Sequence, residues 1–347
     1  MSHFHRKGRG HSASRFAAAV RGLPFIGAAV ALTFAVPFAA PVALQAQGTR
    51  SQPVAPQSTS DEARLEGPLV LRLPASARLL GMANAGAAAA DGDAVFYNPG
   101  MLPQARGVAV SVQRYGARAT SGSFGSVQTF GAYSIGLGAQ LLQYQGDAAD
   151  PVGANERGGP RLSDGGTVTA SSNAFVFGVA RTIKGLRVGA SAKYAEERLD
   201  AVHDGGFALD VGVSKPLGSA TLAMAVQNIG SDPDLGFGPG ALPTRFTVGF
   251  GGGLFPLWEH WDLGMQTQVS VERDGFVRPA GGVELGYVPI EGVAVVVRSG
   301  LRLPREIDEP LATAGFGLNV DRFSVDWAME PMRGGRPVVH RVGIRLR

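Results

Sequence analysis

The sequence predicts an all-β protein: a transmembrane antiparallel β-barrel of about 14 strands with an N-terminal periplasmic hatch or plug segment. Three observations lead to this prediction. Only 17% of the 347 residues are charged and 50 are glycine, whereas an average soluble domain has about 25% charged residues. From Gly107 onward apolar and polar residues alternate with a period of two. Short and long connections alternate along the chain, as they do in outer-membrane barrels.

Composition excludes several classes of site. The chain has no cysteine, so it forms no disulfide, thiolate metal site or thiol nucleophile. The net charge is +4, but much of the positive charge lies within the first 21 residues. We therefore expect no nucleic-acid partner.

The first 46 residues are typical of a signal peptide. A basic stretch is followed by an apolar run that reaches Leu44, and Ala46 offers a small residue for cleavage. We expect residues 1–46 to be removed. The alternative is a membrane anchor, since the apolar run approaches the length that spans a bilayer. Residues 47–67 are rich in Gln, Ser and Pro and predict a flexible tether.

Residues 68–106 predict the hatch, because they combine small apolar side chains with glycines just before the first strand. We expect Gly81, Met82, Gly86, Phe96 and Tyr97 to pack inside the barrel, and Asn98, Pro99 and Gly100 to form a turn. Our hypothesis is that the Asn98-Pro99 turn fixes the hatch against the inner wall, and that Asn98 satisfies backbone groups that the hatch would otherwise leave unpaired. The alternative is an ordinary loop turn.

Residues 107–347 predict the barrel. Most of the alternating segments have the length of about 9 to 11 residues with which a tilted strand crosses a bilayer. The expected strands lie near 107–117, 124–133, 136–146, 168–182, 185–199, 204–216, 219–229, 244–255, 261–273, 276–288, 291–303, 311–319, 322–330 and 336–347.

The connections indicate the orientation. Tight turns are expected at Ser134–Gly136, at Lys184–Gly185 and at Val320–Asp321, whereas the connection from Asp147 to Gly166 is long. Arg273–Gly275 is an exception, because it is a tight Asp-Gly turn where a long loop is expected. An even number of strands places both ends of the barrel, and with them the tether, on the periplasmic side.

Charged residues that strand parity places in the lumen are the second candidate site. They could form an ion-pair lattice that braces barrel and hatch, or an arginine pair could hold a carboxylate ligand. The candidates are Arg187, Lys193, Asp210, Glu284, Arg298, Arg302, Arg341 and Arg345, with Asp262, Glu272, Asp326 and Glu330 facing the same way.

No pattern indicates a metal site, a cofactor site or an enzyme. His260 stands alone between Trp258 and Trp261, and these tryptophans are typical of the aromatic belt of a barrel. Trp327 is expected in a similar position. The sequence contains no Gly-x-Ser-x-Gly elbow.

At the hatch the sequence resembles a known family. The stretch Ala77–Gly86, followed by Asp91–Pro99, is similar to the N-terminal hatch of the FadL superfamily of outer-membrane barrels. Further along the chain, Gln227–Gly230 and Leu242–Gly249 resemble the PorV/PorQ branch of this superfamily. Three features depart from the pattern. Gly100-Met101 follows Asn98-Pro99 in place of Ala-Gly, Ala83-Asn84 follows Met82 in place of Gly-Gly, and the last residue is Arg347 in place of an aromatic residue.

The resemblance implies a function in the outer membrane after signal-peptide removal. A PorV-type barrel would bind exported protein cargo in type IX-like secretion or surface attachment. The alternative is FadL-like passive transport of hydrophobic, fatty-acid-like small molecules through a hatch-gated lumen. A structural or adhesive barrel is a third possibility. The implied partners are outer-membrane lipid, the barrel-assembly machinery, and either secreted cargo or a hydrophobic small molecule.

Overall fold

The computed structural model describes residues 67–116, 118–147, 167–200, 202–234, 240–252, 255–306, 309–333 and 337–347. The predicted signal peptide, nearly all of the predicted tether and most of the long loop after Asp147 lie outside these ranges. Among the described residues, no helix has both the length and the apolar character needed to cross a membrane.

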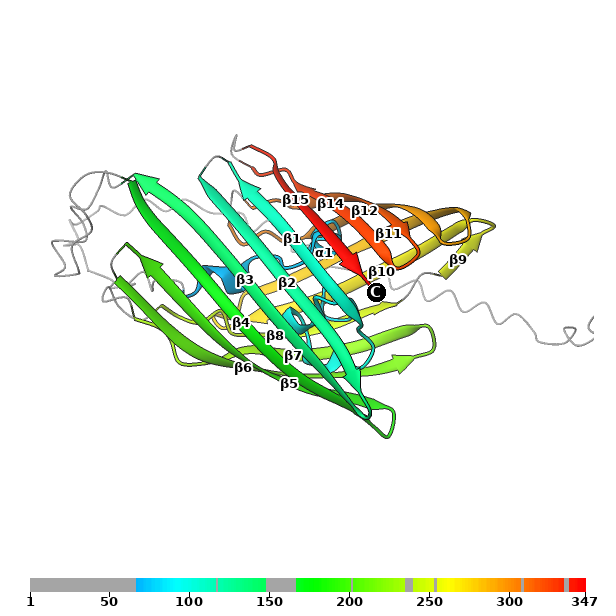
Figure 1. Cartoon of the computed structure of the whole chain (residues 1–347), viewed down its shortest axis with the longest axis horizontal. Coiled ribbons are helices and arrows are strands. Elements are labelled where there is room, and N and C mark those ends of the chain that lie inside the picture. Colours follow the sequence, from blue (N-terminus) through cyan, green and yellow to red (C-terminus); the bar gives the residue numbers. More distant parts are fainter. Residues whose placement is uncertain are drawn as a thin grey trace, which may run out of the picture. The chain divides into compact units, whose positions relative to one another are not determined.

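The strands form one closed antiparallel sheet (Figure 1). Strands adjacent in the chain pair with each other, except that β8 and β9 both pair with β10, and β1 pairs with β15, which closes the ring. The strands are β1 (Gly107–Tyr115), β2 (Ala119–Phe130), β3 (Tyr133–Asp147), β4 (Thr167–Ile183), β5 (Leu186–Leu199), β6 (Val202–Leu217), β7 (Ala220–Gly230), β8 (Arg245–Gly252), β9 (Phe255–Trp258), β10 (Trp261–Glu272), β11 (Val277–Ile290), β12 (Val293–Arg302), β13 (Ala312–Val320), β14 (Phe323–Glu330) and β15 (Val339–Leu346).

The barrel has fourteen strand positions, because β8 and β9 both pair with β10 and together occupy one of them. This confirms the predicted all-β barrel. Several boundaries differ from the prediction. Strand β2 begins at Ala119 and not near residue 124, and the strand expected at 244–255 is divided into β8 and β9. The tight turn expected at Ser134–Gly136 lies instead at Gly131–Ala132, between β2 and β3. Gly131 has a φ of +59°, which glycine adopts at little cost, so the turn forms there and Ser134 becomes part of β3.

Alternation along the strands gives an apolar outer face and an inner face of small and polar side chains. In β15, Val342 and Ile344 are exposed while Arg341 and Arg345 are buried. The same pattern runs around the barrel, and the exposed apolar residues include Val112, Phe124, Leu137, Phe175, Phe177, Phe207, Leu209, Val211, Phe246, Met265, Val283, Val297, Phe316 and Val325. Such an outer face suits a hydrocarbon environment.

The tryptophans lie on the outside, as expected for belt residues. Trp258 and Trp261 flank the turn that contains His260, and 68% of Trp258 is exposed. Trp327 stacks on His340 with ring centroids 5.7 Å apart.

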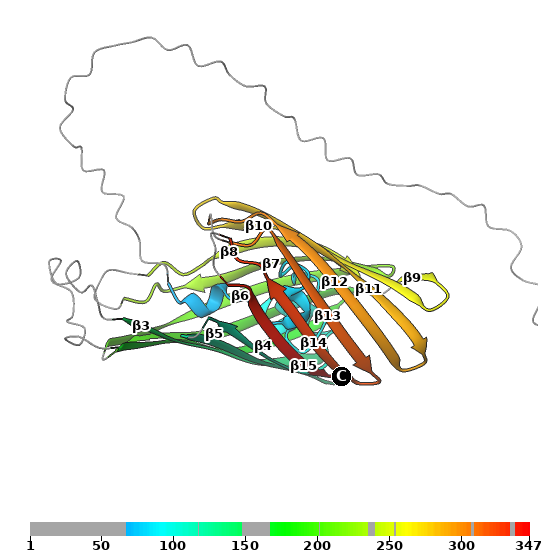
Figure 2. The same cartoon turned by 90° about the horizontal axis from the view of Figure 1, so that it is seen from above.

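The hatch fills the lumen with four short helical turns (Figure 2): η1 (Leu69–Arg72), α1 (Ala77–Leu80), η2 (Ala94–Phe96) and η3 (Pro99–Met101). We call the end of the barrel with the long connections the loop end and the other the turn end. The Gly67 N–H donates to Ala241 O at the loop end, whereas Arg106 contacts Thr129 at the turn end. The hatch therefore runs the length of the lumen.

This path corrects one expectation. Gly67, the last residue of the predicted tether, lies at the loop end and not on the side where β1 begins. An even number of strands places the first and last strand ends on the same side of the barrel. The hatch lies before the first strand, so the strand count does not constrain where the hatch begins.

Inward-facing glycines let the hatch touch the wall. A Cβ on Gly212 of β6 would overlap the side chain of Asn98, and one on Gly300 of β12 would overlap the backbone of Met82 and Ala83. Such close approach of two backbones is possible only at glycine. The high glycine content of the chain thus has a structural use at the boundary between wall and hatch.

Candidate functional site: the hatch, its ion-pair network and the vestibule

Asn98 lies at the predicted hatch turn and is fully buried. Its Nδ2 donates to Ala87 O at 2.9 Å, and its Oδ1 accepts from the Gly100 N–H at 2.8 Å. Pro99 follows as the first residue of η3, where a missing N–H costs nothing. Asn98 therefore joins two parts of the hatch and caps η3.

Two wall residues hold this turn from outside. Gln227 of β7 donates its Nε2 to Phe96 O at 2.8 Å, and the hydroxyl of Ser214 in β6 donates to Gly100 O at 2.8 Å. Both carbonyl groups are buried at the hatch surface, so the wall supplies partners that the hatch itself lacks.

The other hatch residues singled out in the sequence are also buried. Met82 is fully buried, and Gly81 lies against Gly315 of β13. Gly86 lies against the ring of Tyr97, where a Cβ would overlap the ring. The Tyr97 hydroxyl donates to Asn84 Oδ1 at 2.8 Å and accepts from the backbone N–H groups of Ala75 and Ser76. Tyr97 therefore fastens the chain that leads into α1.

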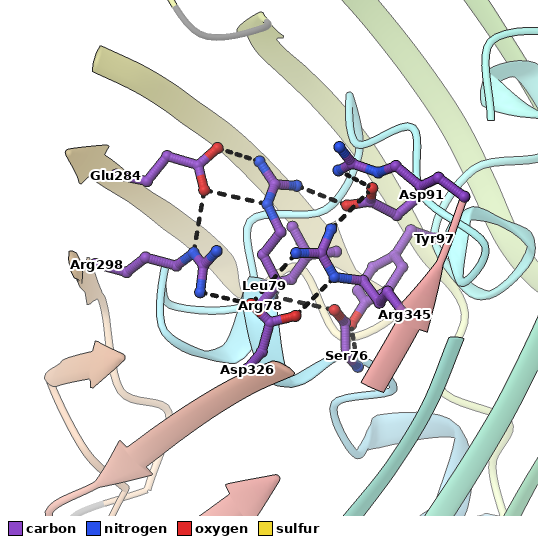
Figure 3. A network of polar contacts seen from close by, with 10 residues as sticks. Ser76, Arg78, Leu79, Asp91, Tyr97, Glu284, Arg298, Asp326 and Arg345 are labelled. Carbon is purple, nitrogen blue, oxygen red and sulfur yellow. Dashed lines mark hydrogen bonds and ion pairs between the residues drawn. The ribbon is translucent and has the colours of Figure 1, made fainter. Parts of the chain in front are cut away.

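Charged side chains of the hatch and of the wall meet in one network (Figure 3). Arg78 of α1 reaches Asp91 at 2.8 Å and forms a two-bond pair with Glu284 of β11. Arg298 of β12 then links Glu284, at 3.0 Å, to Asp326 of β14, at 2.8 Å. All five side chains are buried.

Two further arginines close the network around Asp91. Arg345 of β15 pairs with Asp326 at 2.6 Å and with Asp91 at 3.0 Å, and Arg347 reaches Asp91 at 2.6 Å. Burial alone would raise the pKa of Asp91, but the guanidinium groups of Arg345, Arg78 and Arg347 hold that pKa well below its usual range. Asp91 is therefore ionised at neutral pH and ties the hatch to β15.

Asp93, two residues further along, behaves differently. It is 2% exposed, and burial together with the neighbouring Asp91 carboxylate raises its pKa to about 6. Ser76 hydrogen-bonds the carboxyl group of Asp93. The Oδ1 atom of Asp93 has no hydrogen-bond partner within the described part of the chain.

The remaining predicted lumen charges lie in separate places. Lys193 pairs with Asp210 at 2.7 Å, and Arg302 pairs with Glu330 at 2.6 Å. Arg341 is fully buried and donates to the neutral side chains of Ser111, Gln113 and Ser123. Arg187 contacts Gln104 near the turn end. Parity thus places these side chains inward but does not show which of them meet.

Arg78 and Asp91 were missed by the sequence reasoning, which considered charges only on strands. Both residues lie in the stretch that resembles the FadL hatch. A charged pair within a segment of alanine and glycine was the available signal, since such charges need buried partners.

Above the hatch, at the loop end, a vestibule of about 430 Å³ opens. The hatch and a loop supply an apolar side, formed by Leu69, Leu71, Leu73 and Leu242. The opposite side is polar and includes Tyr115, Arg245, Glu272, Arg278, Arg302, Glu309 and Glu330. Among the described residues, Tyr115 Oη and Arg302 Nε are buried without a hydrogen-bond partner. The vestibule thus combines an apolar side with a polar and charged one, in which two donor atoms lie buried.

No protein-family model matches the chain, and no curated protein matches it. Solved structures do. The CymD monoaromatic hydrocarbon channel superposes with a TM-score of 0.53 at 10% identity, covering 81% of this chain and 97% of that one. The toluene transporter TodX of Pseudomonas putida gives a TM-score of 0.50 at 10% identity, with coverage of 75% and 94%. The fold is that of the FadL-like outer-membrane barrels. At this level of identity the likeness concerns the fold.

Proposed function

We propose that this FadL-like barrel lets hydrophobic small molecules cross the outer membrane passively, and that the vestibule is where they first bind. The observation that carries the proposal is the vestibule itself: about 430 Å³ of space above a hatch that fills the lumen below. This volume lies within the range of small-molecule sites. Passage of this kind requires no chemical step, which agrees with the expectation that the chain is not an enzyme.

The side chains of the vestibule suggest what such a molecule carries. Leu71 and Leu73 offer apolar contact, while Arg302 and Tyr115 each have a buried donor atom that forms no hydrogen bond with any described residue. A ligand with an apolar body and a carboxylate end would satisfy both sides. The structurally similar channels are described as carrying toluene or monoaromatic hydrocarbons. Toluene is therefore one probe, and dodecanoate, which adds a carboxylate end, is the other.

Binding to the purified barrel tests the proposal. We expect both probes to bind, and dodecanoate to bind more tightly. Leu73→Gln should weaken both by about 1 to 2 kcal/mol through lost apolar contact. Arg302→Gln should weaken dodecanoate alone, by about 1.5 to 3 kcal/mol, because a charge-assisted hydrogen bond is lost.

Arg187→Gln is the matched control, since Arg187 faces inward near the turn end and does not line the vestibule. It should leave both affinities unchanged. Binding of neither probe, or equal losses in the Arg302 and Arg187 variants, would argue against the vestibule as the ligand site.

The PorV-type function predicted from the sequence rests mainly on Gln227–Gly230 and Leu242-Pro243. These residues have local structural roles. Asn228 has a φ of +58° at a bulge between β6 and β7, and its side chain donates to Pro243 O at 3.0 Å. The motif therefore gives cargo handling no separate support, and capture of exported proteins becomes the next experiment only if neither probe binds.

A further inference from the structure

Asp93 is a buried acid that the proposed passage of ligands does not use. It belongs to the hatch, its Oδ1 atom has no partner among the described residues, and a cavity of about 10 Å³ lies beside it. Such a volume holds about one water molecule. An ionised carboxylate at this position would therefore be poorly solvated, whereas a protonated one would carry no charge to solvate.

Among the described residues, no lysine or arginine forms an ion pair with Asp93. On the hatch, Asp93 faces Asp91, Arg78 and Tyr97, and Asp91 already pairs with Arg78. From β15 it faces Arg345 and Arg341.

Across the small cavity from Asp93 lies Asp326 of β14. Arg345 forms ion pairs with both Asp91 and Asp326. Arg341 donates its hydrogen bonds to Ser111, Gln113 and Ser123. The nearby positive charges thus serve other acceptors.

We propose that Asp93 makes the hold of the wall on the hatch sensitive to pH: the hatch is docked most firmly when Asp93 carries a proton, and ionisation of Asp93 loosens it. The proposal does not depend on which ligand the barrel carries. It concerns the boundary between α1, the Asp91 to Asp93 segment and β15, where hatch and wall share their buried charges.

The sign follows from linkage. In the docked hatch the pKa of Asp93 is about 6, and its ordinary value is 3.8. A raised pKa in the docked state gives stabilisation that is complete below about pH 4 and is lost as the pH rises through 6. Between pH 5 and pH 7 the docking equilibrium should weaken about tenfold. Asp91 and the arginines keep their charge across this range, so they add no slope.

Thiol labelling measures the docking directly, because the chain has no cysteine of its own. Ala88→Cys places a thiol in the apolar core of the hatch, where the parent side chain is 6% exposed. Ser219→Cys in the exposed turn between β6 and β7 corrects for the pH dependence of the thiol reaction itself. The corrected labelling rate at position 88 should rise about tenfold from pH 5 to pH 7.

Asp93→Asn in the Ala88→Cys background should keep the slow rate at both pH values, because the amide imitates the protonated acid. A corrected rate that does not change with pH in the parent, or one that rises equally in the Asp93 variant, overturns the proposal. If Asp93→Asn does not assemble, the pH midpoint of labelling in the Ser76→Ala variant tests the proposal instead. This variant removes the hydrogen bond that favours the ionised form, so the midpoint must move to higher pH, and an unmoved midpoint also overturns the proposal.

Discussion

Asn98 shows at the scale of one residue why this hatch has a single arrangement. The side chain is short, and both of its polar ends are used inside the hatch. The hypothesis that it satisfies otherwise unpaired backbone groups is consistent with these two bonds.

Asn98→Ala should destabilise docking of the hatch by about 2 to 6 kcal/mol. The variant leaves Ala87 O and the Gly100 N–H buried without partners, and each such group costs about 1 to 3 kcal/mol. Proteolysis of the hatch in the purified barrel measures the change. Gln104→Ala is the control: it lies at an exposed position near the end of the same segment and loses mainly the solvent-accessible contact with Arg187, so its loss of protection should be much smaller. Equal protection of the two variants would mean that Asn98 forms an ordinary turn.

At the scale of elements, the hatch is held by two different kinds of contact. On the side of β11 to β15 it is held by buried ion pairs, with Arg78 and Asp91 on the hatch. On the side of β2 to β7 it is held by apolar packing and by backbone carbonyls that accept from Gln227 and Ser214. Glycines in the strands make both contacts close enough.

Gly212→Ala should displace the Asn98 turn from β6, because the added methyl group would overlap Asn98 and the backbone of Gly100. Overpacking of this kind costs about 1 to 3 kcal/mol. We expect faster proteolysis of the hatch with an intact barrel, seen as unchanged heat modifiability on a gel. Gly122→Ala is the matched control, since a methyl group there meets nothing closer than 3.9 Å. A hatch equally protected in both variants would contradict close contact between Gly212 and η3.

At the scale of the whole molecule, the barrel closes without help from the hatch. The ladder runs from β1 round to β15 and back through seven residue pairs, beginning at Val108 and Leu346. A ring of fourteen strands is wider than its own side chains can fill. The hatch therefore determines whether the lumen is open.

Deletion of residues 68–106 should leave a barrel that is still heat-modifiable but conducts ions, whereas the parent should show little conductance. Single-channel recording of the two proteins in planar bilayers makes the comparison. An assembled deletion variant that conducts no better than the parent would show that something other than the hatch closes the lumen.

Much of the barrel could be predicted because alternation is a local property. In β15, Val342 and Arg341 are neighbours, and a period of two is enough to place one toward lipid and the other inward. The strand count followed in the same way. Exact turns were less certain, because a tight turn goes to whichever nearby glycine can adopt a positive φ, as Gly131 does.

The sequence by itself therefore determined an all-β barrel, the direction of its side chains and the presence of a small-residue hatch. The tertiary structure alone decided which charges meet and where the hatch begins. Arg78 and Glu284 are 206 positions apart, and Gly67 donates to Ala241 O at the loop end. Periodicity specifies the face on which a residue lies, but contacts inside a closed ring depend on how the ring and the hatch fit together, and no local pattern encodes that fit.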